Sequence, residues 1–378
     1  MDFKNTAEAV SLGHPDKSAD YISSYILDRY LSYDPFTRYA VEVLIKGNTV
    51  VLGGEVKSSK HFDREQIKEF VTSALNEIGY SKHYSSIWKN NAIETEKTKV
   101  VNLIGLQSLD ISRGVSGKNE QNEDRAEVTG WGDQGVFVGY ASRNDKFLSS
   151  SHMKAKRLCS VLYELALYRY NPDSKFFRHD TKLYKDFYAN PSSPVLGLDI
   201  KTQVTTSEEG KIDTVICAVP VLSGCEDLLV SFIKSEIGDE KTKYIVNGTG
   251  KYTVHSSVAD CGITGRKLAC DFYSVSAPIG GGSVWTKDAS KADVSLNLYA
   301  RKLAIDNLEN NDECYVYLSS CIGKEDLPSS VIKTIKDGEV KYKNFQFNKT
   351  AEEVIDSMSL RTPRFALMCR NSMYGFMV

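Results

Sequence analysis

Residues 41–56 read VEVLIKGNTVVLGGEV, two β-prone runs on either side of Lys46-Gly47-Asn48. A short glycine-containing turn between two such runs predicts a β-hairpin. The flanking segments, 16–33 and 63–78, instead space their apolar residues as one face of a helix does, and the first of them ends at Asp34-Pro35. The chain is therefore predicted to begin with the order helix, hairpin, helix.

The same order returns twice further along the chain. The second set consists of a helix at 152–169, a hairpin at 201–219 and a helix at 225–237; the third consists of a helix at 287–307, strands at 313–321 and 331–342 and a helix at 350–358. The first helices of the sets recur at a period of about 135 residues, which is too long for a solenoid repeat. We interpret the pattern as three α+β units of one ancestry, at 1–106, 133–246 and 247–378, although this order is common enough to arise by chance.

The composition limits the class of protein. The 378 residues are 41% hydrophobic and 25% charged, with 47 Lys plus Arg against 49 Asp plus Glu, which is typical of a globular chain and argues against general nucleic-acid binding. No apolar run approaches the roughly 20 residues that cross a bilayer, and no secretory signal core follows the first residues. None of the eight cysteines forms a CxxC pair, so we expect reduced thiols in a cytoplasmic protein, without a zinc site or a disulfide framework.

Residues 107–132 stand apart because they are polar, rich in glycine and without an apolar period. A loop of this length inside a compact domain is typical either of a mobile lid over a site or of a plain surface insertion. Both interpretations stay open at this point.

Two short stretches combine glycine, cations and carboxylates. Gly13-His14-Pro15-Asp16-Lys17 stands at a predicted helix start, where exposed N–H groups attract anions. Residues 260–271 place two glycines around a turn before adjacent Arg266 and Lys267, which only a loop or bulge could aim at one ligand. The plainer interpretations are a helix cap with a solvated lysine and a turn with a solvated basic pair.

A third stretch follows closely, with Gly280-Gly281-Gly282 before Lys287, and with Lys291 and Asp293 after it. On the predicted helix, Lys287 and Lys291 would share a face and repel each other unless an anion lay between them. The glycines do not have the GxxxxGK[ST] spacing of a P-loop, so alone they are weak. The three stretches together supply what a metal–polyphosphate site needs, because cations neutralise phosphate oxygens while Mg²⁺ takes one or two carboxylates.

In detail, the chain resembles a known family, the S-adenosylmethionine synthetases, also called methionine adenosyltransferases. The matching motifs follow the family's order at close to its spacing: 7–17 (AEAVSLGHPDK), 53–55 (GGE), 132–135 (GDQG), 199–204 (DIKTQV), 260–267 (DCGITGRK) and 280–293. Beyond Asp293 the likeness fades to a short tail at Tyr374-Gly375-Phe376. The resemblance implies an α+β fold of three similar units about a pseudo-threefold axis. It also implies homodimers or pairs of dimers with active sites between subunits, and Mg²⁺ and K⁺ as cofactors.

The resemblance further implies a reaction of ATP with L-methionine, in which the methionine sulfur attacks C5′ of ATP and the expelled tripolyphosphate is hydrolysed to pyrophosphate and phosphate. A thioether has no proton to lose, so this attack needs alignment and charge stabilisation rather than a general base. The implied catalytic residues are His14, Lys201, Arg266, Lys267 and Lys287. The implied contacts to ATP are these five together with Asp199, Lys251, Tyr252, Asp260 and Ser283. The implied contacts to methionine are Glu55, Gln107, Asp133, Asp260 and Lys291. Asp16 and Asp293 would hold Mg²⁺, Glu42 would hold K⁺, and loop 107–132 would be the gate of the site.

Several positions depart from the family pattern. Leu12 and Leu106 stand where the family has Glu and commonly Lys, Ile245 replaces an aromatic residue, Ile279 a histidine and Lys251 an arginine, and Ser283-Val284-Trp285-Thr286 replaces Ala-Phe-Ser-Gly. The cations expected at the phosphates are kept, which favours an active but divergent enzyme. The alternatives are a non-catalytic relative that regulates active subunits, and a polyphosphatase that performs no alkyl transfer.

Overall fold

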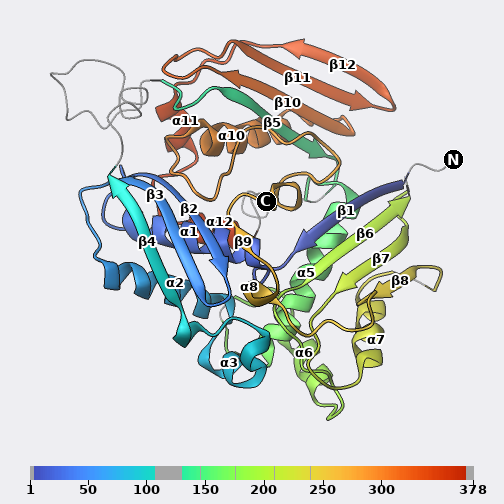
Figure 1. The fold of residues 1–378 in the computed structure, drawn as a ribbon. Coiled ribbons are helices and arrows are strands. Elements are labelled where there is room, and N and C mark those ends of the chain that lie inside the picture. Colours follow the sequence, from blue (N-terminus) through green and yellow to red (C-terminus); the bar gives the residue numbers. More distant parts are fainter. Residues whose placement is uncertain are drawn as a thin grey trace.

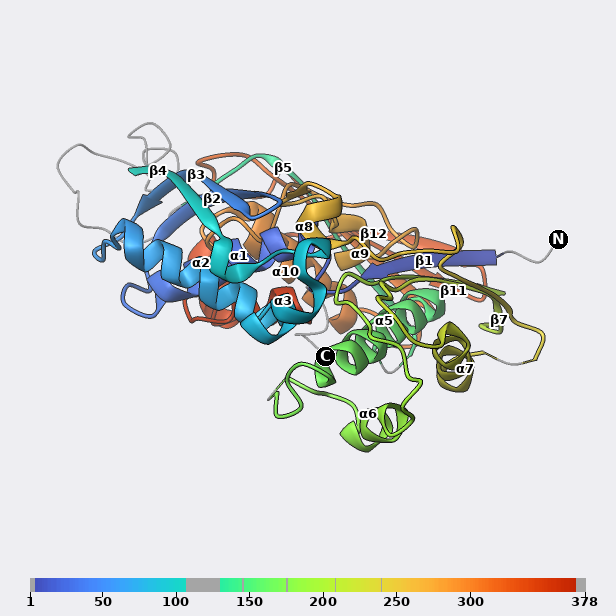
Figure 2. The same cartoon turned by 60° about the horizontal axis from the view of Figure 1, so that its bottom comes forward.

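The computed structural model describes residues 4–106, 130–144, 146–174, 176–207, 209–238 and 240–371. Within this part of the chain, helices and strands form a mixed α+β fold, as the sequence predicts, and the strands form three four-stranded sheets. Figure 1 shows the sheets as three groups of strands around the middle of the molecule, and Figure 2 shows most helices gathered below the strands.

The hairpin of residues 41–56 lies at the centre of the first sheet. Strands β2 (Arg38–Lys46) and β3 (Thr49–Lys57) pair antiparallel, and β4 (Lys99–Leu106) runs parallel to β3. Helices α1 (Pro15–Leu31) and α2 (Arg64–Ile78) pack on the inner face, toward which alternate apolar residues of β2 and β3 point. The predicted helix, hairpin and helix are confirmed, since each lies within a few residues of its expected bounds.

The second sheet repeats this arrangement. Strands β6 (Lys201–Ser207) and β7 (Ile212–Ala218) form the predicted hairpin, and β8 (Lys243–Val246) runs parallel to β7. Helix α5 (Ser150–Tyr168) packs on β6, and α7 (Glu226–Glu236) connects the hairpin to β8. In both sheets a helix separates the hairpin from the third strand, and such a crossover is what a parallel neighbour requires.

The third sheet differs at its last strand. Strands β10 (Glu313–Ser320) and β11 (Ser329–Lys336) are antiparallel, and β12 (Glu339–Asn344) also pairs antiparallel with β11. Only Asp337 and Gly338 separate β11 from β12, both with positive φ, as a two-residue hairpin turn requires. Helix α10 (Ala292–Asp306) packs on this sheet, with α11 (Ala351–Ser357) beside it.

Each sheet is completed by a strand from elsewhere in the chain. Strand β1 (Lys4–Val10) precedes α1 but pairs with β6, β5 (Gly135–Ser142) precedes α5 but pairs with β10, and β9 (Gly262–Ile263) precedes α10 but pairs with β2. Each unit thus gives a strand to the next unit in cyclic order, which is what an approximate threefold arrangement would produce. The axis itself and the unit boundaries at 106, 133 and 247 stay predictions.

One sequence-based prediction is wrong. The helix expected from residue 287 begins at Ala292, because residues 286–288 run alongside β2 instead: the Val41 N–H donates to Thr286 O at 2.9 Å, and the Asp288 N–H donates to Tyr39 O at 3.1 Å. Lys287 and Lys291 therefore do not share a helix face.

The remaining elements connect these layers. They are α3 (Lys82–Trp88), the 3₁₀ turns Lys89–Asn91 and Thr95–Lys97, α6 (Thr181–Tyr188), α8 (Ser256–Ala259), α9 (Leu268–Asp271) and α12 (Phe365–Arg370). Among the helices of the described ranges, none combines the length and the apolarity that a membrane span needs.

Candidate active site

The outer edge of β2 gathers two of the three glycine- and cation-rich stretches. Gly262 and Ile263 pair with the end of β2 as β9, while Lys287 lies opposite Ala40 near its beginning. The turn that carries Arg266 and Lys267 and the loop that carries Lys287 thus line one sheet edge. The two segments also touch, since a Cβ on Gly265 would lie 3.1 Å from the Cβ of Ser283.

The beginning of α1 brings the third stretch to the same place. The Ile263 N–H donates to Asp16 Oδ1 at 2.9 Å, and Lys267 Nζ lies 2.6 Å from Asp16 Oδ2. Arg266 Nε lies 4.0 Å from Asp16 Oδ1. Gly265, with φ of +75°, turns the chain between β9 and these cations. Both cations therefore approach one carboxylate from a loop, as the sequence requires of a shared site.

His14 is the N-cap of α1 and is buried. Its Nδ1 accepts the Asp16 backbone N–H at 3.2 Å, so the neutral ring carries its proton on Nε2. Burial lowers its pKa to about 3, with help from the nearby Lys267 and Lys201 and against the opposite effect of Asp16 and Asp260. The ring is thus a neutral N–H donor, and its electrostatic neighbours include Lys201 and Asp260.

Asp199 joins the same cluster from the segment before β6. Its Oδ2 accepts the Ser256 N–H at 2.9 Å, and its carbonyl accepts the Tyr252 hydroxyl at 3.2 Å. Burial raises the pKa of the Asp199 carboxyl to about 6, opposed by the Ser256 hydrogen bond, by the nearby Tyr252 hydroxyl and by Lys201. This segment packs directly on the glycine before His14, since a Cβ on Gly13 would lie 2.3 Å from Leu198 O.

The glycine triplet shapes the surroundings of Lys287. The Lys287 ammonium pairs with Asp293 Oδ2, and the Gly282 N–H donates to Asp293 Oδ1 at 2.9 Å. A Cβ on Gly282 would lie only 3.3 Å from Lys287 Nζ, so a side chain there would crowd the ammonium.

Other predicted residues lie around this cluster. Glu55 of β3 lies opposite Ala40 of β2, which in turn lies opposite Lys287. Glu42, also on the outer face of the sheet, accepts a hydrogen bond from the Thr264 hydroxyl. Lys291 pairs with Asp288 at 3.3 Å.

The chain before β5 passes close by, because a Cβ on Gly132, next to Asp133, would lie 2.5 Å from Ser290 O. Lys251 is exposed in the loop before Tyr252. Gln107 and the rest of the predicted gate up to residue 129 lie outside the described residues.

The carboxylates of Asp16, Asp293 and Glu42 are chemically suited to Mg²⁺ and K⁺, the cations that the family resemblance implies. No group of three or more His, Cys, Asp or Glu side chains converges on a metal-sized space in the described ranges. Mg²⁺ in phosphate sites, however, takes only one or two carboxylates and completes its shell with waters and substrate oxygens. Asp16 and Asp293 each face a lysine expected to contact phosphate, so each has a counter-charge before any ligand arrives. Glu42 and the Thr264 hydroxyl offer only oxygens, which suits K⁺.

Lys17 lies where neither interpretation of its stretch expects it. It is neither a solvated lysine nor a cation turned toward the site, because it is buried and pairs with Asp271 at 2.7 Å and with Asp20 at 3.4 Å. The three-residue spacing of Lys17 and Asp20 on one helix was a usable local signal. Nothing local points to Asp271, which is 254 residues away.

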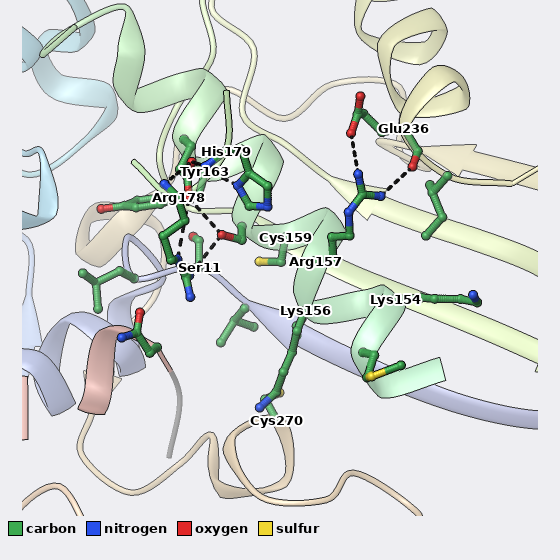
Figure 3. A pocket seen from close by; sticks show the side chains of 18 of the residues that line it. Ser11, Lys154, Lys156, Arg157, Cys159, Tyr163, Arg178, His179, Glu236 and Cys270 are labelled. Atoms are coloured by element: carbon green, nitrogen blue, oxygen red, sulfur yellow. Dashed lines mark hydrogen bonds and ion pairs between the residues drawn. The ribbon is translucent and has the colours of Figure 1, made fainter. Parts of the chain in front are cut away.

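A cavity of about 690 Å³ lies along α5 (Figure 3). Its described lining includes Ser11, Lys156, Tyr163, Arg178 and Cys270, and it includes none of the predicted site residues. We therefore locate the candidate site at the open outer edge of β2, where the chemistry converges, rather than in this cavity. A site completed by a second subunit would be an open surface in one chain.

Comparisons with known proteins agree with the motifs. Family models of the N-terminal and C-terminal domains of S-adenosylmethionine synthetase match residues 2–109 and 254–377. The S-adenosylmethionine synthase of Azobacteroides pseudotrichonymphae genomovar. CFP2 is 31% identical over 397 residues, which cover 99% of this chain and 86% of that protein. A solved structure described as an unusual S-adenosylmethionine synthetase from Campylobacter jejuni is 28% identical, with a TM-score of 0.78 over 99% of this chain and 95% of its own. The chain therefore belongs to the S-adenosylmethionine synthetase family.

Proposed function

We propose that this chain is an active methionine adenosyltransferase that makes S-adenosylmethionine from ATP and L-methionine and then hydrolyses the tripolyphosphate. The observation that carries the proposal is the convergence of His14, Arg266 and Lys267 on Asp16, with Lys287 on the same sheet edge. A cluster of cations at one place on the surface is the arrangement that a polyphosphate requires.

In the proposed step, a lone pair of the methionine sulfur forms the S–C5′ bond while the C5′–O bond breaks and its electrons pass to the tripolyphosphate. No proton is removed from the nucleophile. Arg266, Lys267 and Lys287 would neutralise the charge that grows on the phosphates, and Lys201 would reach them from β6. Such preorganised charge is the largest catalytic contribution in many enzymes.

His14 would donate its Nε2–H to the leaving oxygen. Its neutral state suits this role, because a neutral imidazole donates a hydrogen bond without adding a further charge to an already cationic site. The Asp16 N–H on Nδ1 supports the role by selecting the tautomer with the proton on Nε2.

Asp16 and Asp293 would hold Mg²⁺, and Glu42 would hold K⁺. When bound, Mg²⁺ supplies further positive charge to the phosphate oxygens. The ion pairs with Lys267 and Lys287 keep both carboxylates and both ammonium groups compensated while the site holds no substrate.

Glu55, Asp133, Asp260 and Lys291 would surround methionine, with a carboxylate meeting its amino group and a lysine its carboxylate. The outer face of the first sheet supports a homodimer, because Leu44, Val101 and Leu103 are exposed there beside Glu42. A second copy on this face would cover both the apolar residues and the open side of the site.

The test is to incubate the purified full chain with ATP, methionine, Mg²⁺ and K⁺ and to measure S-adenosylmethionine by mass spectrometry and phosphate release in parallel. Formation of the product with both pyrophosphate and phosphate supports the proposal. A folded chain that forms no product at any salt concentration would instead be a regulatory relative. Tripolyphosphate hydrolysis without product, indifferent to methionine, would identify a polyphosphatase.

A further inference from the structure

The three cation-bearing segments meet at one buried carboxylate, that of Asp271. Asp271 ends α9, the short helix that follows Arg266 and Lys267 directly. Its Oδ2 accepts hydrogen bonds from Lys17 Nζ at 2.7 Å and from Trp285 Nε1 at 2.8 Å. Lys17 lies three residues after His14, and Trp285 lies two residues before Lys287. One carboxylate oxygen thus connects the start of α1, the turn 262–267 and the loop 283–288.

Further contacts close this arrangement into a network. The Lys17 ammonium lies over the Trp285 ring, 4.6 Å from its centroid, and 3.4 Å from Asp20 Oδ2. Asp20 Oδ1 accepts the Gly265 N–H at 2.8 Å, in the turn just before Arg266. Asp20 therefore links Lys17 a second time to the turn that carries Arg266 and Lys267.

Side chains of helix α5 also hold the end of α9 that carries Asp271. His152 and Lys156, one helical turn apart, reach the last two carbonyls of α9: His152 Nε2 lies 2.9 Å from Cys270 O, and Lys156 Nζ donates to Asp271 O at 3.4 Å. Figure 3 shows the Lys156 side chain descending from α5 to Cys270 at the border of the cavity. The carbonyl end of a short helix is thus held by two side chains of a long one.

The need for such a network follows from the charges. Arg266, Lys267 and Lys287 carry charges of the same sign on two segments that approach each other at Gly265 and Ser283. Lys17, Asp271 and Trp285 are all buried, so their contacts form in a low dielectric, where charge-assisted hydrogen bonds are strongest. None of the three is among the residues expected to contact substrate.

We infer that Asp271, Lys17 and Trp285 form a positioning network that fixes the separation between the turn 262–267 and the loop 283–288. The network sets the affinity for tripolyphosphate and the rate of sulfur attack without touching the substrates. The fixed separation of the two segments is independent of the proposed function, whereas the effect on affinity and rate rests on the proposed function.

The test compares Trp285→Phe with Trp88→Phe. Phenylalanine keeps most of the ring packing and removes the N–H donor. Trp88, the last residue of α3, is the matched control, because it is also fully buried and donates its indole N–H to the Tyr170 hydroxyl at 2.7 Å.

The first measurement is amide hydrogen exchange on the ligand-free chain, which does not depend on any activity. In Trp285→Phe, exchange in peptides covering 262–268 and 283–291 should rise about tenfold, while Trp88→Phe should leave these peptides unchanged. Equal exchange in Trp285→Phe and the wild type would overturn the network, whatever the chain catalyses.

The second measurement is calorimetric titration with Mg²⁺-tripolyphosphate, alongside steady-state kinetics. Trp285→Phe should raise the Kd about tenfold at unchanged stoichiometry and lower kcat by roughly 10–100-fold with a smaller change in the KM for methionine, as expected of misplaced groups. A merely structural defect would instead lower the stoichiometry at the same Kd. A wild type that neither binds tripolyphosphate nor makes product would refute the proposed function and leave the exchange result to decide the network.

Lys156→Met serves as a milder variant if Trp285→Phe does not fold. It removes the Lys156 contact to the Asp271 carbonyl, leaves the Lys17 and Trp285 contacts to Asp271 Oδ2 in place, and should raise exchange in 262–268 by about threefold. No change in this peptide would count against the network.

Discussion

The imidazole of His14 is prepared for its proposed role entirely by its neighbours. Burial and the nearby Lys267 and Lys201 lower its pKa to about 3, and the Asp16 N–H fixes the tautomer. A histidine with these surroundings stays neutral at every pH at which the protein would work. The same surroundings make a measurable contribution to stability.

We expect the wild type to lose stability relative to His14→Asn as the pH falls from 7.5 to 5. In this range the unfolded chain binds a proton on His14, with a pKa near 6.5, that the folded chain does not bind, so the free energy of unfolding decreases. The relative loss should be roughly 1–2 kcal/mol by urea unfolding at the two pH values. Exposed His61→Asn is the control, and the same pH dependence in both variants would contradict the buried, neutral assignment.

Lys287→Ala should lower kcat for S-adenosylmethionine formation by roughly 10²–10³, because it removes charge stabilisation of the leaving tripolyphosphate. Lys302→Ala is a matched control, since Lys302 forms an exposed ion pair with Asp306 on α10, away from the site. The measurement is steady-state kinetics at saturating ATP and methionine. An unchanged kcat in Lys287→Ala would show that another cation meets the phosphates.

The strands help to build the candidate site, because each sheet includes one strand from a distant part of the chain. Strand β9 carries the basic turn onto β2, β1 delivers His14 to α1, and β5 follows directly on Asp133. These strands lie close to helices of the receiving unit. At Gly139 of β5 a Cβ would lie 1.9 Å from Ala300 O of α10.

Gly139→Ala should therefore destabilise the chain by about 3 kcal/mol, since strand or helix must move to admit a methyl group. Gly248→Ala is the control, because its nearest neighbour would be Ile245 Cγ2 at 3.5 Å, an ordinary contact. Urea unfolding midpoints with unchanged m-values would measure both. Equal stability of the two variants would mean that β5 does not pack on α10 as described.

The molecule as a whole presents an apolar sheet face next to its polar site. The register aligns Ile263, Leu44, Val51 and Val101 in one row across the first sheet, and Glu42, Gly53 and Leu103 in the next. Leu103 is 64% exposed. An exposed apolar face beside the candidate site is what the proposed homodimer would cover.

Leu103→Asp should dissociate the proposed homodimer and lower activity in parallel, because a carboxylate placed in an apolar interface loses its hydration. Val340→Asp on β12, which is 45% exposed in the native chain, is the control for an added surface charge. Analytical ultracentrifugation gives the mass, and the product assay gives the activity. A Leu103→Asp variant that keeps the wild-type mass would place the interface elsewhere.

The local elements and the charged motifs could be predicted from the sequence alone. The helix–hairpin–helix order could be predicted because apolar periodicity and a glycine turn are local signals that span about 10–20 residues. The hairpins β2–β3 and β6–β7 lie where they were expected. The composition of the three stretches suggested a metal–polyphosphate site, and the match of their motifs to a family gave His14, Asp16, Arg266 and Lys267 their expected roles in it. No spacing along the chain relates residues that are about 250 positions apart.

The tertiary structure alone decided how these parts meet. Residues 286–288 pair with β2 rather than start a helix, because the sheet edge offers hydrogen-bond partners that local propensity does not register. Lys17 turns inward because Asp271 and Trp285, from distant segments, replace the hydration that its ammonium group loses on burial. The strand that each sheet takes from a distant segment and the lowered pKa of His14 likewise depend on contacts between residues remote in sequence, and such contacts form only when the chain has folded.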